Sequence, residues 1–240
     1  MLQLEVRKLG MVNSSVLRLE LDPVGSACNY KPGQFITLCF ESQGKSYKRS
    51  YSMATPPGGR VELFVALVKG GVGSRYLTSL RPGMKVEAQE PQGIFGVLPS
   101  ENGRTVLIAT STGVVPFRSM KPQIETLLKE GRKVSLLYGV RRSEDLLFEK
   151  EWFDWLRHYE EFEFIPCFSQ PATAQDCQRF GAIQGRVQVG LQRLPLVSSQ
   201  NTYSLCGNPE MIDEVEKMLI EAGIASANIM VEAFESHDIA

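Results

Sequence analysis

The chain has 240 residues, of which 43% are hydrophobic and 22% charged, and these values are ordinary for a soluble globular protein. Its net charge is −1 and its isoelectric point is about 6.2, so composition does not indicate a nucleic-acid-binding surface. No apolar run reaches the roughly 18 residues of a membrane span, and the alternating start MLQLEVRKLG is unlike a signal peptide. We therefore expect a cytoplasmic protein.

The cysteines argue against a metal framework. No two of them are spaced as CxxC, the pattern typical of zinc and iron–sulfur sites. Their odd number indicates thiols rather than a set of disulfides. The five residues are Cys28, Cys39, Cys167, Cys177 and Cys206.

The first hundred residues have the pattern of short strands. LQLEV and SVLRLEL alternate between apolar and polar residues, and QFITLCF follows the turn Lys31-Pro32-Gly33. VELFVALV (61–68) is apolar on both faces, and KVEAQE follows a second Pro-Gly turn. Closely spaced strands of this kind predict a small antiparallel β-barrel over residues 1–100.

Beyond residue 100, strands and helices alternate. TVLIAT (105–110) and KVSLLYGV (133–140) are continuous apolar strands, and PEMIDEVEKMLIEAG has helical spacing. The alternation predicts a doubly wound α/β domain with a parallel sheet over residues 101–240. Pro122 predicts a kink or an early break in the helix that follows residues 110–117, and the polar stretch 169–178 is expected to be a loop or an insertion. Trp152 and Trp155 are expected in the core.

Three stretches have the pattern of anion-binding loops. TSTGVVPF (110–117) and CGNPEM (206–211) each join a strand to a helix, where free N–H groups face a ligand. KGGVGSRYLTSL (69–80) places glycines before a short helix. Each stretch taken alone also fits an ordinary connection: a strand–helix turn, a hairpin tip, or a buried cysteine before a capped helix.

Taken in order, these stretches resemble the ferredoxin–NADP reductase family of flavin-dependent oxidoreductases. Residues 49–52 (RSYS) match its R-x-Y-S flavin motif, and residues 71–74 match its G-x-x-[ST] pyrophosphate motif. Residues 111–117 match its G-T-G-I-A-P-F element, and residues 206–211 match C-G-x-P-x-M. Residues 232–234 match a terminal E-x-aromatic, so the resemblance covers nearly the whole chain.

The resemblance implies a flavin, FAD rather than FMN, held between the two domains. Arg49 would pair with the pyrophosphate, Tyr51 would stack against the flavin ring and Ser52 would lie near its reactive nitrogen. If the strand alternates without a bulge, Arg49 and Tyr51 share one face and Ser50 and Ser52 the other. The residues assigned to FAD are Arg49, Ser50, Tyr51, Ser52, Ala66, Leu67, Val68, Gly73, Ser74, Thr112 and Phe234.

The same resemblance implies a site for NADP or NAD. Ser52, Cys206 and Glu232 would surround the point of hydride transfer as catalytic residues, with Cys206 as a positioning group and not a nucleophile. Phe234 would cover the flavin face until the nicotinamide displaces it, and the tail 235–240 would touch the adenine side or be disordered. The residues assigned to NAD(P) are Thr112, Gly113, Pro116, Gly139, Arg141, Ser169, Cys206 and Gly207.

Two departures from the family pattern affect the nucleotide site. Ser111 stands where the family has the first glycine of G-T-G, which reduces backbone freedom. Gln170 stands where NADP-preferring relatives carry an arginine for the 2′-phosphate. Another arginine could replace that charge or be a surface residue, so both nucleotides stay open, with a lean to NADPH. The candidates are Arg141, Arg142, Arg179 and Arg186.

The implied activity is hydride transfer between NAD(P)H and bound FAD, with single electrons passed to a ferredoxin- or flavodoxin-like carrier. The sequence leaves two alternatives open. The acceptor could be a free flavin, a quinone, a haem protein or an oxygenase component. The chain could also be a flavin-binding electron-transfer subunit of a larger complex, although its intact nucleotide half argues against this. His158 and His237 are assigned no role.

Overall fold

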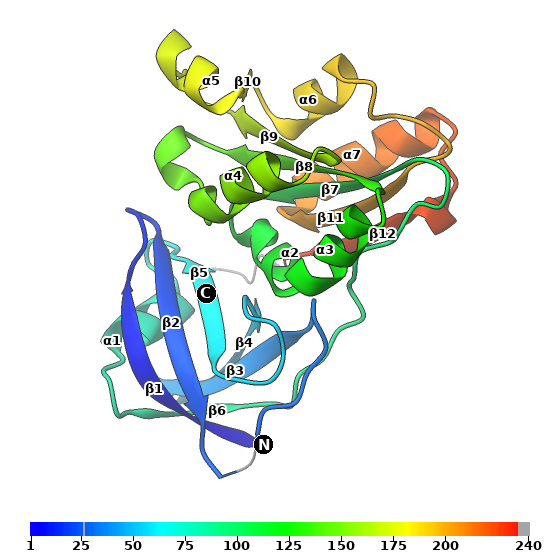
Figure 1. The fold of residues 1–240 in the computed structure, drawn as a ribbon. Coiled ribbons are helices and arrows are strands. Elements are labelled where there is room, and N and C mark those ends of the chain that lie inside the picture. Colours follow the sequence, from blue (N-terminus) through cyan, green and yellow to red (C-terminus); the bar gives the residue numbers. More distant parts are fainter. Residues whose placement is uncertain (26, 235–240) are drawn as a thin grey trace. The chain divides into compact units, whose positions relative to one another are not determined.

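The computed structural model describes residues 1–25 and 27–234 as two compact units (Figure 1). The barrel unit comprises Met1–Ile94 and the short return Val115–Met120. The α/β unit comprises Phe95–Val114 and the described chain from Lys121 onward. The return of the chain into the barrel unit was not indicated by the sequence, and the boundary at residue 100 stays a prediction.

The barrel unit is a curled antiparallel sheet in the order β4-β3-β6-β1-β2-β5. The bridge between Met53 and Leu63, with the Ala54 N–H bound to the Glu62 carbonyl at 2.8 Å, joins the end of β4 to β5. The predicted antiparallel barrel is confirmed. Its elements are β1 (Leu2–Met11), β2 (Val16–Pro23), β3 (Phe35–Ser42), β4 (Lys45–Ser52), β5 (Val61–Ala66), α1 (Val72–Ser79) and β6 (Lys85–Ala88).

The alternation of the sequence explains this sheet. Leu2, Leu4 and Val6 of β1 are buried and the residues between them are exposed, as one core-facing side requires. VELFV, the first five residues of β5, is buried throughout. The strand ends at Ala66 and not at residue 68, because Leu67 and Val68 turn into the glycine loop that precedes α1.

The α/β unit is built on a parallel sheet in the order β10-β9-β8-β7-β11-β12. Helices α6 and α7 pack on one face with the core residues Val106, Ile108 and Leu205, and α3 and α4 lie on the other face (Figure 1). The predicted fold class is confirmed. The strands are β7 (Arg104–Thr110), β8 (Lys133–Val140), β9 (Phe162–Phe168), β10 (Ile183–Gln184), β11 (Thr202–Gly207) and β12 (Ile229–Ala233).

The helices follow the strands in sequence. They comprise η1 (Ser111–Val114), α2 (Val115–Ser119), α3 (Lys121–Lys129), η2 (Ser143–Asp145), α4 (Glu149–His158), α5 (Ala174–Phe180), α6 (Val187–Arg193), α7 (Pro209–Glu221) and η3 (Ser226–Asn228). A kink or an early break was expected near Pro122, and the structure has the break, since α2 ends at Ser119 and α3 begins at Lys121. Trp152 and Trp155 are both buried, as expected.

One local expectation was wrong. The stretch 169–178 was expected to be a loop or an insertion without regular structure of its own, but its second half forms α5. The hydroxyl oxygen of Thr173 accepts the Asp176 N–H at 3.0 Å and caps the helix, which buries Phe180 before it ends at Gly181. The polar composition masked this cap and its single apolar anchor. Among the described residues, no helix combines the length and apolar character needed to cross a membrane.

Candidate flavin and nucleotide sites

Strand β4 presents the residues of the flavin motif on two faces. Its register against β3 is unbroken from Lys45 to Ser52, so the conditional prediction that Arg49 and Tyr51 share a face holds. Both of these side chains are half-buried, whereas Ser50 is exposed. The hydroxyl oxygens of Ser50 and Thr37 lie 2.9 Å apart, and Ser52 is buried at the strand's end.

The glycine loop before α1 lies directly against these side chains. A β-carbon on Gly73 would stand 3.3 Å from the Tyr51 hydroxyl oxygen and 3.4 Å from Arg49 Cγ. Helix α1 begins after Gly71 without a side-chain cap, so the N–H groups of its first turn remain available to a ligand. The structure thus brings the two flavin motifs together in one unit and leaves an uncapped helix start beside an arginine.

The loop itself is held by Ser74. The Ser74 hydroxyl oxygen accepts the Val68 N–H at 2.8 Å, and the Leu67 N–H binds the Ser15 carbonyl at 2.7 Å. Leu67 packs on the barrel core, whereas Ala66 and Val68 are exposed. Ala66, Leu67 and Val68, which the sequence assigned to FAD, therefore lead directly into the glycine loop.

Tyr51 is held in its neutral form. Burial raises the pKa of its phenol from 10.0 to about 12, although the nearby Arg49 guanidinium acts in the opposite direction. A neutral phenol can donate a hydrogen bond from its hydroxyl while its ring offers a flat apolar face. Both properties suit contact with a flavin.

In the α/β unit, two glycines allow the ends of β7 and β11 to touch. A β-carbon on Gly113 would stand 2.2 Å from the Cys206 carbonyl oxygen. Gly207 has φ +136°, and a β-carbon there would stand 2.4 Å from the Thr110 hydroxyl oxygen. That oxygen accepts the Asn208 N–H at 3.1 Å. The two turns form one backbone-lined cradle at the carboxyl edge of the parallel sheet.

The turn after β7 contains a strained residue. Ser111 has φ +51°, in the left-handed region where glycine is relaxed. Its carbonyl accepts a hydrogen bond of 2.9 Å from the fully buried side chain of Tyr138 on β8. Thr112 and Gly113 follow as buried residues of η1. The departure at Ser111 therefore leaves the turn in place, at the cost of strain.

The remaining residues assigned to the nucleotide occupy neighbouring positions. Gly139 is buried near the end of β8, and a β-carbon there would stand 3.1 Å from Thr110 Cγ2. Pro116 is buried in the first turn of α2, which belongs to the barrel unit. Ser169 follows β9 directly, and its N–H binds the Val140 carbonyl at 3.0 Å.

Cys206 and Glu232 are register partners on β11 and β12. Complete burial, with the Glu232 charge as the second cause, raises the pKa of the Cys206 thiol well above its ordinary value. The thiol is therefore protonated at neutral pH and is not a thiolate nucleophile. The Phe234 N–H binds the Gly207 carbonyl at 2.9 Å, so the chain after β12 stays beside the β11 turn.

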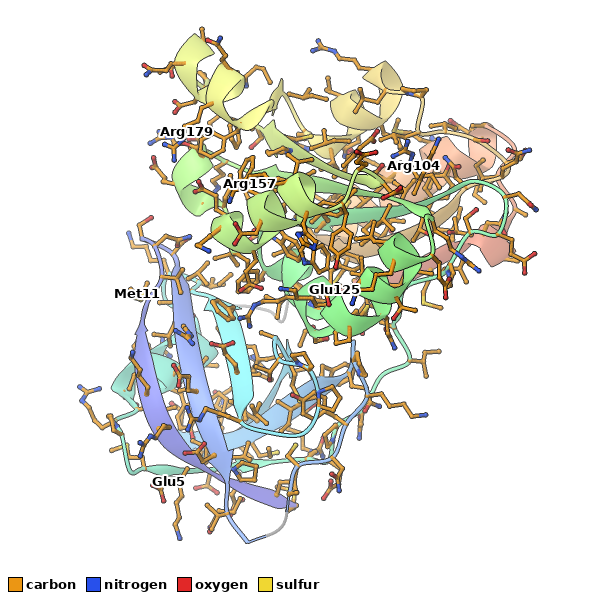
Figure 2. All side chains as sticks on the ribbon, in the orientation of Figure 1. Glu5, Met11, Arg104, Glu125, Arg157 and Arg179 are labelled. Carbon is orange, nitrogen blue, oxygen red and sulfur yellow. The ribbon has the colours of Figure 1, made fainter. Side chains whose placement is uncertain are left out.

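The four candidate arginines differ in their surroundings. Arg142 donates from Nε to the Gln170 side-chain oxygen at 2.8 Å, and Arg141 immediately precedes it, with its carbonyl bound to the Gln170 N–H at 3.0 Å. Arg179 instead faces Glu149 at 3.4 Å and lies over the Phe180 ring, and Figure 2 shows it on α5. Arg186 is exposed at the start of α6.

Some site residues were missed from the sequence. Thr110, Tyr138 and Asn208 support the cradle through a hydroxyl, a phenol and a helix cap. A hydroxyl at the end of an apolar strand was the available signal for Thr110. Ser52 belongs to the barrel unit and Cys206 and Glu232 to the α/β unit, so their meeting stays a prediction. The predicted tail 235–240 lies outside the described residues.

The two sites fit dinucleotides, because each combines a close-packed glycine turn with a helix start. The described residues contain no group of three or more His, Cys, Asp or Glu side chains arranged for a metal ion.

Comparisons with known proteins agree with a flavin site in the barrel unit and a nucleotide site in the α/β unit. The family model of the oxidoreductase FAD-binding domain matches residues 2–96, and that of the oxidoreductase NAD-binding domain matches residues 107–217.

Solved structures of low sequence identity share the fold. The cytochrome P450 reductase GcoB of Amycolatopsis superposes with a TM-score of 0.83 at 24% identity, over 97% of this chain and 69% of that chain. A ferredoxin–NADP+ reductase from Neisseria gonorrhoeae, solved with bound FAD and NADP, has a TM-score of 0.81 at 21% identity, over 97% and 98% of the two chains.

Curated relatives extend the agreement to sequence. Ferredoxin–NADP reductase B of Sorangium cellulosum is 30% identical over 218 residues, which are 88% of each chain. The reductase component DmpP of phenol 2-monooxygenase, from a Pseudomonas species, is 30% identical over 212 residues. That match covers 85% of this chain but only 58% of the relative.

Fold, sites and domain matches together define a two-domain flavin and nicotinamide-nucleotide oxidoreductase, with FAD and NAD(P) as its cofactors. More specifically, the chain belongs to the ferredoxin–NADP reductase family, as its motifs suggested.

Proposed function

We propose that this enzyme takes hydride from NADPH at bound FAD and passes electrons singly to a small acidic carrier of the ferredoxin or flavodoxin kind. The observation that carries the proposal is the presence of two close-packed glycine turns, one in each unit. Gly73 lies against Arg49 and Tyr51 in the barrel unit, and Gly113 lies against Cys206 in the α/β unit. Bound FAD supplies the two-electron to one-electron chemistry, and the protein supplies binding and orientation.

The barrel residues have distinct proposed roles. Arg49 pairs with the flavin pyrophosphate, which also faces the uncapped start of α1. Tyr51 packs its neutral ring on the flavin and donates from its hydroxyl. Ser52, buried at the end of β4, holds its hydroxyl toward the reactive edge of the flavin.

The α/β residues orient the nicotinamide. The dinucleotide phosphates bind at the turn of Thr112 and Gly113. Cys206 packs its protonated thiol against the nicotinamide edge as a positioning group. In this proposal Glu232 would orient Ser52 or relay a proton, and Phe234 would cover the flavin face in the absence of the nicotinamide.

The preference for NADPH rests on Arg142. Gln170 stands where NADP-preferring relatives have an arginine, and its side-chain oxygen holds the Arg142 guanidinium at 2.8 Å. A cation is therefore present at that place although it comes from the end of β8. Glu144, 3.7 Å from Arg142, offsets part of this charge. An arginine fork suits a 2′-phosphate better than a 2′-hydroxyl.

The acidic nature of the acceptor rests on the distribution of charge. Residues 1–94 carry 12 Lys and Arg against 7 Asp and Glu, a net charge of +5. Residues 95–240 carry 14 against 20, a net charge of −6. The exposed Lys48 adjoins Arg49, and the exposed Lys69 and Arg75 flank the glycine loop. A basic surface around the flavin motifs attracts an acidic protein by electrostatic steering.

A second candidate acceptor is an oxygenase component. Its support is the likeness to the reductase component of phenol 2-monooxygenase, of which this chain spans 58%. The acceptor charge separates the two candidates. Lys48→Glu should slow electron transfer to an acidic ferredoxin about tenfold at low salt, with flavin reduction by NADPH unchanged.

Lys133→Glu, which reverses an exposed charge in the α/β unit, serves as the control for Lys48→Glu. Equal rates of electron transfer to ferredoxin in the two variants would exclude an acidic carrier docking on the barrel unit.

Flavin binding is tested separately. Arg49→Ala should lower FAD retention during purification far more than Arg81→Ala, a matched loss of an exposed barrel arginine. Equal retention would contradict the pyrophosphate role of Arg49.

A further inference from the structure

Two residues within the span of the nucleotide-domain match belong structurally to the flavin barrel. Arg118 and Ser119 lie inside residues 107–217, yet the segment Val115–Met120 that contains them is part of the barrel unit. Each makes a polar contact to a different strand end of the barrel. Neither residue was assigned a role from the sequence motifs.

Arg118 reaches the carboxylate of Glu62 on β5. Its Nη1 lies 2.6 Å from Glu62 Oε2, and the other carboxylate oxygen accepts from Arg18 Nε. The side chain of Glu62 is only 5% exposed, so a carboxylate that is costly to bury is balanced by two guanidinium groups. The same network continues through Glu20 to Arg60 and Asp22, so three cations face three carboxylates.

Arg118 also fixes the chain just after the flavin motif. Its Nη1 donates to the Ala54 carbonyl at 3.2 Å, and the Ala54 N–H donates to the Glu62 carbonyl at 2.8 Å. Ala54 follows Ser52 by two residues, and Met53 between them pairs with Leu63. The end of β4 is thus held between β5 and the Arg118 side chain.

Ser119 holds the opposite strand end. Its fully buried hydroxyl accepts the Gly33 N–H at 2.8 Å and donates to the Pro116 carbonyl at 2.7 Å. Gly33 leads into β3, whose first residue, Phe35, is the register partner of Ser52. Consecutive residues of α2 therefore secure both strand ends at the pair that presents Ser52.

We propose that Arg118 and Ser119 are positioning residues for the flavin site, which act by setting the position of Ser52 relative to the flavin. This inference rests on the proposed role of Ser52 in flavin-dependent hydride transfer. It adds that two residues within the nucleotide-domain match, Arg118 and Ser119, support the flavin site.

The test is a double-mutant cycle on the full chain loaded with FAD. Arg118→Met and Ser119→Ala are each made alone and in a Ser52→Ala background. The readouts are the midpoint potential and visible spectrum of bound FAD, and the rate of flavin reduction at saturating NADPH. We expect each single variant to slow that rate about tenfold and to shift the flavin potential, with the dissociation constant of NADPH unchanged.

In the Ser52→Ala background, both effects should largely disappear, because the residue they position is absent. Arg118→Lys should restore part of the loss, since it keeps the charge opposite Glu62. Arg104→Met is the matched control, because the Arg104 side chain is 20% exposed against 21% for Arg118 and is likewise paired with a carboxylate, Glu163 at 2.8 Å. It should leave potential and rate unchanged.

The same fold loss in both backgrounds would overturn the inference, as would a loss no larger than that of Arg104→Met. If Arg118→Met fails to fold, Ser119→Ala alone decides, since it removes only a hydroxyl. The potential and spectrum do not depend on NADPH. A wild-type flavin that NADPH does not reduce would therefore refute the proposed function. Potential shifts that are the same with and without Ser52→Ala would refute only the positioning role.

Discussion

A β-carbon on residue 113 would stand 2.2 Å from the carbonyl oxygen of Cys206, so the turns that follow β7 and β11 are packed backbone against backbone. Such a distance is far below van der Waals contact, so a side chain at residue 113 requires one of the two backbones to shift. This relationship makes Gly113 a position of the nucleotide site where even one added methyl group should be felt.

Gly113→Ala should therefore lose nucleotide binding. We expect the dissociation constant of NADPH to rise by about 10- to 100-fold and stability to fall by roughly 1–3 kcal/mol, because the turn must move away from Cys206. Fluorescence titration and thermal unfolding measure the two effects. FAD retention should be unchanged, and Gly96→Ala, where a β-carbon meets nothing within 4 Å, should alter neither property.

Ser111→Gly should stabilise the protein. Ser111 has φ +51°, and relief of left-handed strain exceeds the added flexibility of the unfolded chain by up to about 1 kcal/mol. Gln43→Gly, in the turn between β3 and β4, is the matched control because Gln43 also has φ +51°. Both should raise the denaturation midpoint. If Ser111→Gly alone lowers the denaturation midpoint, the serine side chain stabilises the folded state by more than its backbone strain destabilises it.

The neutral Tyr51 predicts a loss of stability at high pH. Its pKa is about 12 in the folded protein against an ordinary 10.0, so the folded state holds the proton more tightly than the unfolded state. This contribution is complete below about pH 10 and is lost as the pH rises toward 12, by roughly 2 kcal/mol.

Urea unfolding of the flavin-free protein at about pH 9 and about pH 11 measures the Tyr51 effect. Tyr51→Phe should show a smaller decline than the wild type over this interval. A decline remains in the variant because the pKa values of Tyr30, Tyr76 and Tyr203 are also raised by burial. Identical declines in the two proteins would contradict the burial of an un-ionised Tyr51.

Nucleotide preference should depend on Arg142. Arg142→Ala should lower kcat/KM for NADPH by about 10- to 100-fold, the worth of a charge-assisted hydrogen bond, and leave NADH unaffected. Gln170→Arg should strengthen the preference for NADPH. Arg179→Ala is the control, since Arg179 is engaged with Glu149 and the Phe180 ring. Equal losses for both nucleotides would assign Arg142 to a contact other than the 2′-phosphate.

The fold was predictable because its signals are local. The alternation in LQLEV and the apolar runs TVLIAT and KVSLLYGV each describe one strand from its own residues. The flavin and nucleotide motifs were equally local, since residues 49–52 and 111–117 are contiguous. Their predicted placement at strand ends agrees with the structure for both turns of the α/β unit.

Long-range contacts were not predictable from these patterns. The bond from Arg118 to the Ala54 carbonyl joins residues 64 apart in sequence, and that from Gly33 to Ser119 joins residues 86 apart. Nothing near Arg118 in the chain indicates a buried carboxylate on β5. The sequence likewise placed an arginine near Gln170 only as one of four candidates, because the pairing of β8 with β9 decides which one reaches it.

The most direct test is anaerobic mixing of the purified, FAD-loaded protein with NADPH, and in parallel with NADH, while the yellow absorbance is followed. We expect rapid bleaching by NADPH, slower or weaker bleaching by NADH, and recovery of the colour when an acidic ferredoxin is added. A flavin that neither nucleotide bleaches, but that dithionite reduces fully, would contradict hydride transfer from a nicotinamide to FAD in this protein.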